Sequence, residues 1–195
     1  MKKIMFDDRC GLTIAVIEGR KTMTRRVLGR EPRIARHINK SLFDDGIDPC
    51  AFYRDERGLC RLLDEDMKVI LPQYSVGEEV AVAQPYSAIP AADNLKGEFG
   101  WGNKMYVKPA LMPHRIRITG IRAERIHDIS DEDCYKEGIM ARESKNTGLH
   151  VFTFDDINFF PSPKRAFGAL VKKAMGKKGW LGNPFVWVYT FELVK

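Results

Sequence analysis

The sequence of 195 residues predicts a single α+β domain with a strongly bent or closed sheet. Its length suits one domain that carries insertions. The clearest strand pattern, over 114–126, shifts its apolar positions by one residue at Gly120, which is typical of a β-bulge or a barrel corner. The last strand, over 185–194, alternates aromatic and β-branched residues. It is therefore predicted to be central, or to lie between the sheet and the helices.

The N-terminal quarter predicts a helix that runs into a basic strand. Residues 1–6 predict a short first strand, and the apolar residues of 10–18 predict a largely buried helix. Gly19 suits the left-handed position that follows a helix, and the next strand is predicted over 22–28. The basic segment 19–26, Gly-Arg-Lys-Thr-Met-Thr-Arg-Arg, thus begins at a helix-to-strand corner. Such a cluster favours an anionic partner, although a solvated edge strand is an alternative explanation.

The middle of the chain predicts one buried strand and one long loop. Residues 76–83 read as a turn followed by a compact apolar run over 80–83, which is consistent with a strand covered on both faces, and Gln84 and Tyr86 lie at its exit. The following loop, 87–103, contains Trp101. Loops of this length inside compact domains often carry function. Trp101 is therefore either a base-stacking residue or a packing residue beneath the loop.

The C-terminal part predicts two helices before the last strand. Ser130 is the expected N-cap of a short helix that Gly138 ends, and Ser162-Pro163 begins a longer one with an apolar face. Residues 140–160 between them are predicted to be irregular. Their aromatic content, including Phe152 and Phe160, indicates more than a linker.

Composition favours an anionic partner and argues against a metal centre. Lys and Arg number 32 against 26 Asp and Glu, which gives a formal charge of +6 and a pI near 9.1. The four cysteines have no paired short spacing, and the four histidines have no metal-ligand spacing. We therefore expect no disulfide framework, no metal and no cofactor.

No segment has the pattern of a signal peptide or of a membrane-spanning helix. The basic N-terminus is followed at once by Asp7, Asp8 and Arg9, where a signal peptide would need an apolar run. The sequence therefore predicts a cytoplasmic protein with no membrane partner. It leaves the oligomeric state open.

Four segments, taken in order, resemble the ASCH domain family, particularly its larger phage and prophage members. They are 19–26 with the apolar helix before it, 76–82, 118–126 together with 129–133 and 137–139, and 183–192. The resemblance implies a PUA-like mixed β-barrel with packed helices, in a superfamily associated with RNA and modified nucleotides. Three insertions exceed the minimal family core and are expected to be long loops: about 29–75, 87–107 and 140–162.

The resemblance also implies candidate catalytic residues. Some compact bacterial ASCH proteins are amidohydrolases that remove the acetyl group from the exocyclic amine of acetylcytidine with a lysine, a threonine and a glutamate. In motif position these correspond to Lys21, Thr24 and Glu137. In a regular strand Lys21 and Thr24 would project to opposite faces, so they converge only if Lys21 belongs to the corner after Gly19.

The primary prediction is binding of RNA or a modified nucleotide in a basic cleft, and amide hydrolysis is the alternative. Binding would use cations for phosphates, with aromatic residues for stacking on bases. The candidate binding residues are Arg20, Arg25, Arg26, Gln84, Tyr86 and Trp101. A third alternative is a non-catalytic interaction protein of phage or prophage origin that uses the aromatic residues of 152–160.

Overall fold

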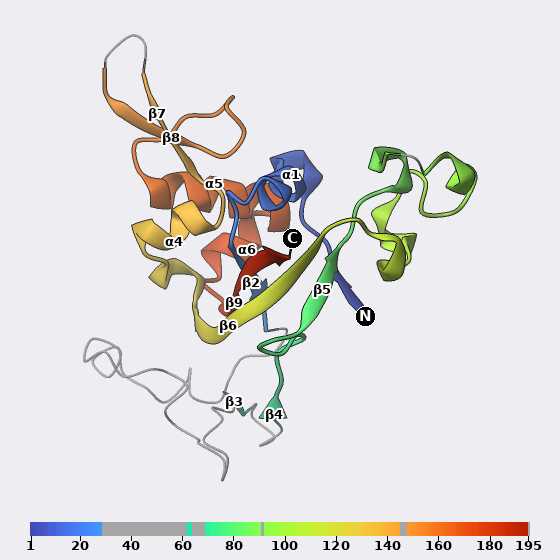
Figure 1. Ribbon diagram of the computed structural model, residues 1–195. Coiled ribbons are helices and arrows are strands. Elements are labelled where there is room, and N and C mark those ends of the chain that lie inside the picture. The colour runs from blue at the N-terminus through green and yellow to red at the C-terminus, as the bar shows by residue number, and fades with distance from the viewer. Residues whose placement is uncertain (29–61, 64–68, 91, 145–147, 195) are drawn as a thin grey trace.

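The computed structural model describes residues 1–28, 62–63, 69–90, 92–144 and 148–194, and its largest sheet has five strands (Figure 1). β1 is parallel to β5, and the other neighbours are antiparallel. The predictions of a mixed α+β fold and of a central last strand are confirmed. In sheet order the strands are β1 (Lys2–Ile4), β5 (Glu79–Val82), β6 (Arg115–Arg125), β9 (Phe185–Val194) and β2 (Met23–Val27).

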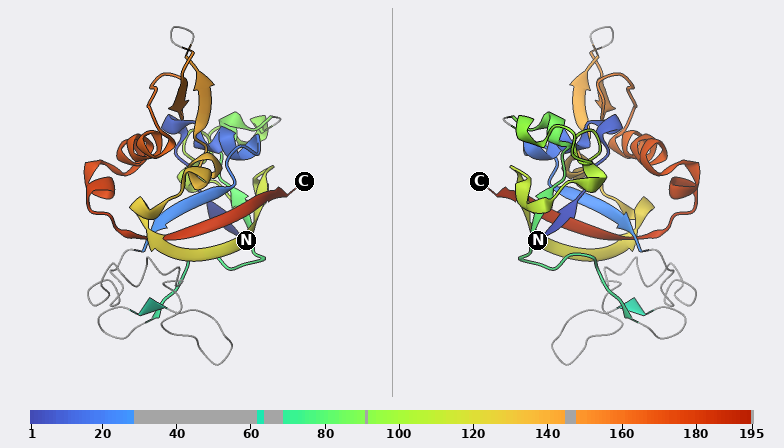
Figure 2. Two further views of the ribbon diagram at one scale, coloured as in Figure 1. Left: turned by 90° about the vertical axis from the view of Figure 1, so that its left-hand side faces the viewer. Right: turned by 90° about the vertical axis from the view of Figure 1, so that its right-hand side faces the viewer.

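The helices gather over one face of the curved sheet (Figure 2). The predicted N-caps form as expected, because the Ser130 hydroxyl accepts from the backbone N–H of Asp133 and the Ser162 hydroxyl accepts from that of Arg165. The helices are α1 (Leu12–Ile17), α4 (Asp131–Lys136), α5 (Pro163–Met175) and α6 (Lys177–Leu181), and a 3₁₀ turn, η1 (Asp8–Cys10), precedes α1.

The main core lies between these helices and the sheet. Ile116 and Ile118 of β6 and Val188 of β9 are fully buried, and Phe167 of α5 packs in the same cluster. Burial of apolar side chains of this kind supplies the main favourable contribution to folding. The helix face and the sheet face therefore hold one another in place.

The predicted bulge in β6 is confirmed. The pairing of β6 with β9 shifts register between Ile118 and Gly120. A Cβ at Gly120 would lie 2.6 Å from the Thr190 Oγ1, so the close approach of the two strands favours glycine there. No strand pairing among the described residues joins β1 to β2. Closure of the sheet into a barrel stays a prediction.

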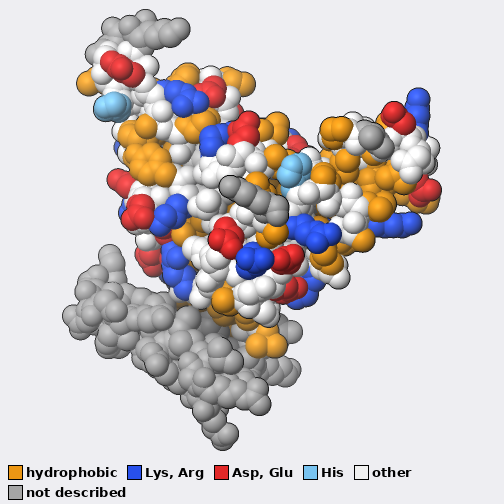
Figure 3. All heavy atoms as spheres, in the orientation of Figure 1, with side chains coloured by type: hydrophobic (Ala, Val, Ile, Leu, Met, Phe, Trp, Pro, Cys, Tyr) orange, Lys and Arg blue, Asp and Glu red, His pale blue; other side chains and the backbone are white. Residues whose placement is uncertain are grey.

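The segment after β5 folds over a small apolar cluster of its own. Tyr86, Val107 and Met112 are buried there, and Trp101 packs against them. Hydrophobic side chains gather over this lobe in the space-filling view (Figure 3). The segment between β5 and β6, which includes the expected loop 87–103, contains four 3₁₀ turns among its described residues: η3 (Tyr86–Ala88), η4 (Asp93–Leu95), η5 (Lys104–Tyr106) and η6 (Pro109–Leu111).

The prediction that 140–160 is irregular is wrong. β7 (Met140–Glu143) and β8 (His150–Thr153) form an antiparallel hairpin. Phe152 and Phe160 also exchange backbone hydrogen bonds of 2.9 and 2.8 Å, so the aromatic residues belong to an ordered unit.

Of the 29–75 insertion, 29–61 and 64–68 lie outside the described residues. β3 (Leu62–Leu63) pairs with β4 (Val69–Ile70).

No helix in the described part of the chain combines the length and the apolar character that crossing a bilayer requires.

Replacing Gly100 by alanine should destabilise the lobe, because an added Cβ would lie 2.5 Å from the Tyr86 ring. The ring cannot move away freely, since its hydroxyl accepts a 2.8 Å hydrogen bond from the Lys108 N–H. We expect Gly100→Ala to lower the free energy of unfolding in urea by about 1–3 kcal/mol. Gly102→Ala is the matched control, because its Cβ would meet open space, and it should change stability by less than about 0.5 kcal/mol. Equal effects of the two variants would contradict this packing.

Candidate functional site

The corner before β2 brings Lys21 to the side of the molecule where Thr24 lies. Gly19 has a φ of +74°, and the N–H of Lys21 donates to the Ala15 carbonyl at 2.9 Å. β2 begins only at Met23. Lys21 therefore belongs to the corner and not to the strand, so the alternation of strand side chains does not separate it from Thr24.

Lys21 and Glu137 form a buried ion pair. The Lys21 Nζ lies 2.5 Å from the Glu137 Oε2, and it also donates to the Glu137 carbonyl at 2.9 Å. Their side chains are 1% and 4% exposed. Glu137 caps the C-terminus of α4, and the Thr22 N–H donates to the Lys136 carbonyl at 2.9 Å. The end of α4 and the start of β2 are thus fastened by main-chain and side-chain bonds.

Arg25 binds the other oxygen of the Glu137 carboxylate. Its Nη1 donates to the Glu137 Oε1 at 2.9 Å, and its side chain is only 2% exposed. Two more carboxylates hold the same guanidinium: Glu124 at 2.6 Å and Asp133 at 3.0 Å. Burial alone would lower the pKa of Arg25, but Glu137 and Glu124 outweigh it and the pKa is raised. Glu137 therefore balances two buried cations at once.

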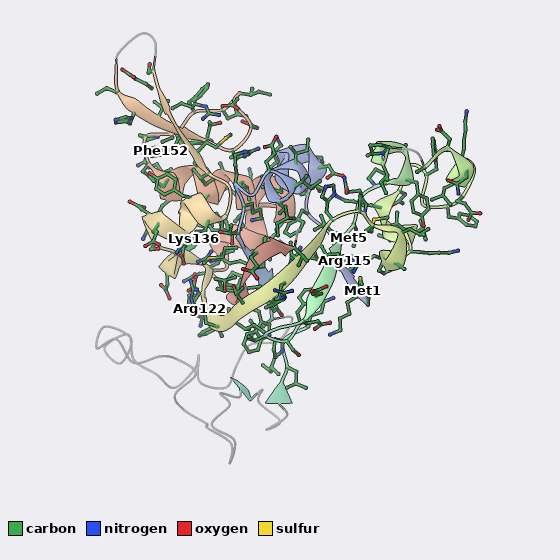
Figure 4. All side chains as sticks on the ribbon, viewed as in Figure 1. Met1, Met5, Arg115, Arg122, Lys136 and Phe152 are labelled. Carbon is green, nitrogen blue, oxygen red and sulfur yellow. The ribbon has the colours of Figure 1, made fainter. Side chains whose placement is uncertain are left out.

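An outer layer of charge completes this cluster. Arg122 on β6 pairs with Glu124 at 2.9 Å and also with Asp133 on α4. Figure 4 shows Arg122 on β6 below α4, which carries Lys136. Ion pairs of 3.0 Å or less thus connect three cations and three carboxylates: Lys21, Arg25, Arg122, Glu124, Asp133 and Glu137. Lys136 lies farther from this network, 3.8 Å from Asp133.

A pocket of about 650 Å³ opens beside the network, within the range of small-molecule sites. Lys21, Thr24 and Glu137 all line it, so the three predicted catalytic residues share one cavity. Thr24 is 5% exposed, and its hydroxyl makes no hydrogen bond to any described residue. Five cationic and three anionic side chains line the pocket, an excess of two cations. The pocket therefore favours a neutral or anionic ligand.

Burial lowers the pKa of Lys21 below its ordinary value of 10.5. The charge and hydrogen bond of Glu137 oppose this shift, whereas Arg26 and Arg25 add to it. The net direction is downward, which increases the fraction of Lys21 that is an uncharged amine. An uncharged lysine is the form that can accept a proton.

Arg26 places a second guanidinium at the pocket. Its Nη2 donates to the Met5 carbonyl at 2.5 Å, and its guanidinium carbon lies 5.7 Å from the centre of the Phe6 ring. The Arg26 Nε is buried and has no hydrogen-bond partner among the described residues. A buried donor without a partner is costly, so the position of this nitrogen is not explained by any hydrogen bond within the described residues.

The structure does not bring the other predicted binding residues to this pocket. Arg20 is outside it and pairs with Glu18 at 2.5 Å. Gln84 is buried and its Oε1 lies 2.9 Å from the His114 Nδ1. Tyr86 and Trp101 pack in the separate cluster of the η3–η6 lobe. The Tyr86 ring, at 3% exposure, presents no face on which a base could stack.

Sequence reasoning missed three residues of the charged network, two of which, Glu124 and Asp133, contact Arg25. Asp133 was considered only for helix capping, and Glu124 and Arg122 only as part of a strand. One local signal was available, because Asp133 and Glu137 are four apart and therefore share a face of α4. Their convergence on Arg25 depends on the packing of α4 against β2 and β6, which no local pattern shows.

A cysteine on α4 does not offer an alternative nucleophile. Burial, with a smaller contribution from Asp131, raises the pKa of Cys134 to about 12, so its thiol stays protonated. Among the residues that the structure describes, no group of three or more His, Cys, Asp or Glu side chains is arranged to hold a metal ion.

Comparison with known proteins gives no match: no family model, no curated protein and no solved structure is similar to the chain.

The Lys21→Met variant should reveal the lowered pKa through the pH dependence of stability. A lowered pKa means that the native state binds fewer protons at Lys21 than the unfolded state, so the contribution of this site to stability rises with pH. We expect the difference in unfolding free energy, wild type minus Lys21→Met, to rise from neutral pH toward pH 10.5. Urea titrations at several pH values measure it.

Lys136→Met is the control for that measurement. Lys136 is bonded to Glu132, and this bond raises its pKa, so the corresponding difference should stay level from neutral pH and fall as the pH passes the ordinary value of 10.5. A difference for Lys21→Met that is flat or falls with pH would contradict the lowered pKa of Lys21.

Proposed function

We propose that the chain is an ASCH-type, PUA-like domain whose pocket binds an acylated nucleoside or nucleotide and hydrolyses the amide on its exocyclic amine. One observation carries this proposal: the buried Lys21–Glu137 pair lies in the same pocket as Thr24. The Thr24 hydroxyl makes no hydrogen bond to any described residue. A nucleophile, a candidate base and a group that orients the base are the parts that covalent amide hydrolysis requires.

The two hydrogen bonds of Lys21 suit the uncharged amine. A neutral amine has two N–H donors and one lone pair, whereas the ammonium has three donors. Glu137 offers two acceptors, its carbonyl and its Oε2. When both N–H groups are held there, the lone pair takes the remaining tetrahedral position. Glu137 therefore orients the amine. Arg25 binds the other carboxylate oxygen, so Lys21 is not the only cation that neutralises Glu137.

In the first half of the reaction Thr24 becomes acylated. Its oxygen attacks the amide carbon while its proton passes to the Lys21 Nζ. The tetrahedral intermediate then collapses, the C–N bond breaks, and Lys21 returns the proton to the departing nitrogen. The products of this half are the free amine and an ester on Thr24.

In the second half water replaces the amine. Lys21 accepts a proton from water as the water oxygen attacks the ester carbon. The intermediate collapses with cleavage of the bond to Thr24, and Lys21 returns the proton to the Thr24 oxygen. The carboxylic acid product leaves, and all groups are back in their starting states.

Arg26 supports charge stabilisation on the ligand. Arg26 lines the pocket, and its guanidinium keeps its charge even though burial lowers its pKa. The guanidinium is therefore a candidate donor to the oxyanion of the intermediate or to a nucleoside oxygen.

Binding of RNA or a nucleotide without chemistry is the second candidate function. The observation that favours it is the excess of two cationic side chains in the pocket lining. This function needs no uncharged lysine, and it predicts an affinity that falls steeply with salt concentration.

Purified protein should deacetylate acetylcytidine, and Thr24→Ala should lower kcat/KM by about 10³-fold or more because it removes the nucleophile. Lys21→Ala should cause a similar loss. Thr22→Ala is the matched control, because Thr22 is a neighbouring threonine outside the pocket lining, and it should retain activity. Each rate is measured as the amount of cytidine released over time, which chromatography quantifies.

Full activity in Thr24→Ala would contradict the assignment of the nucleophile. Absence of activity in the wild type together with salt-dependent RNA binding that Arg26→Gln weakens would favour the second candidate function instead.

A further inference from the structure

One wall of the pocket is a single apolar face of α5. Five of its residues line the cavity, and their spacing along the chain (3, 1, 3 and 1 positions) places them on one side of the helix. They are Phe167, Leu170, Val171, Ala174 and Met175. Every residue that α5 contributes to the lining is apolar, although the helix also carries Lys172 and Lys173 on its exposed side.

The charged lining residues come from other elements. Lys21, Arg25 and Arg26 come from the corner and from β2, and Glu137 comes from the end of α4. Asp7, Asp8 and Arg9 come from the η1 turn, and Lys104 comes from η5. A substrate carbonyl at Thr24 would therefore lie between a polar wall and an apolar wall. An amide has two arms, the acyl group and the amine part, and only the acyl group of an acylated nucleoside is purely apolar.

We infer that the α5 face is a subsite for an unbranched aliphatic acyl group longer than acetyl, an inference that rests on the proposed amide hydrolysis. The substrate class is accordingly a nucleoside acylated on its exocyclic amine with a short- to medium-chain fatty acyl group. The nucleoside faces the cationic wall.

The size of the pocket and its rim agree with this occupant. At about 650 Å³ the cavity has room beyond an acetyl group, whose single methyl cannot cover five apolar side chains. Three exposed apolar residues extend the apolar surface to the mouth of the pocket: Met5 at 39%, Val27 at 42% and Met175 at 43% exposure. A longer chain would remove this surface from water, which is favourable.

The experiment compares cytidines that carry acetyl, butanoyl and hexanoyl groups on the exocyclic amine. Each buried methylene should raise kcat/KM about threefold, so the hexanoyl substrate should exceed the acetyl substrate by roughly 10²-fold. A flat or falling series would overturn the inference while leaving acetyl hydrolysis, and with it the proposed function, in place.

Variants of α5 test where the chain lies. Ala174→Phe fills the subsite and should reduce the hexanoyl-to-acetyl ratio of kcat/KM to near one. Met175→Asn, at the exposed rim, is a milder variant that should reduce this ratio about threefold. Lys172→Phe, on the exposed side of α5, adds the same ring outside the pocket and should leave the ratio unchanged. Equal losses for both substrates in Ala174→Phe would overturn the inference, because α5 would then hold the nucleoside.

A binding measurement separates failure of the subsite from failure of the chemistry. Thr24→Ala removes the proposed nucleophile, so calorimetry with the same three cytidines reports affinity alone. If no substrate is hydrolysed by the wild type but affinity still rises about threefold per methylene, hydrolysis is wrong and the acyl subsite stands. If affinity is independent of chain length, the subsite is wrong.

Discussion

The carboxylate of Glu137 is the group on which the site depends, because it balances two buried cations from different parts of the chain. One oxygen receives Lys21 at 2.5 Å and the other receives Arg25 at 2.9 Å. A buried charge without a partner costs several kcal/mol, and Glu137 is the carboxylate that pairs with Lys21, so Lys21 depends on it most directly. The carboxylate in turn lies at the C-terminal end of α4. There the Lys136 carbonyl accepts a hydrogen bond from the Thr22 N–H. The corner, the edge strand and the short helix are thereby fixed as one unit.

In the proposed mechanism, this sharing is also what suits a fully buried lysine to act as a base. A lysine with a carboxylate to itself would be stabilised as the ammonium, which is no base. Here Arg25 occupies the second oxygen of Glu137, and Glu124 and Asp133 hold Arg25 in that position. Burial and the neighbouring guanidinium groups lower the pKa of Lys21, while the hydrogen bonds from Glu137 fix its orientation. The same network thus provides both stability and the chemical character of the site.

Local features were predictable from the sequence because each depends on a few neighbouring residues. Gly19 indicated the corner, Ser130 and Ser162 indicated helix starts, and Gly120 indicated the bulge in β6. The group of Lys21, Thr24 and Glu137 came from resemblance to a family, since 116 positions separate Lys21 from Glu137. The structure places these three at one pocket.

Features that depend on long-range packing were not predictable. Tyr86 was expected near a ligand, but the lobe after β5 has its own apolar cluster that buries the ring. Arg25 was expected to meet phosphate, but three carboxylates from α4 and β6 already hold it. The β7–β8 hairpin was missed because the aromatic residues of 150–160 follow no clear alternation, and pairing with Phe160 stabilises it.

The most direct measurement of the central claim is mass spectrometry of the protein quenched during turnover of an acylated cytidine. The account predicts a species heavier by one acyl group, with the group located on Thr24 by fragmentation of the tryptic peptide 22–25, and absent from Thr24→Ala. Turnover with the acyl group on another residue, or with activity unchanged in Thr24→Ala, would contradict the account.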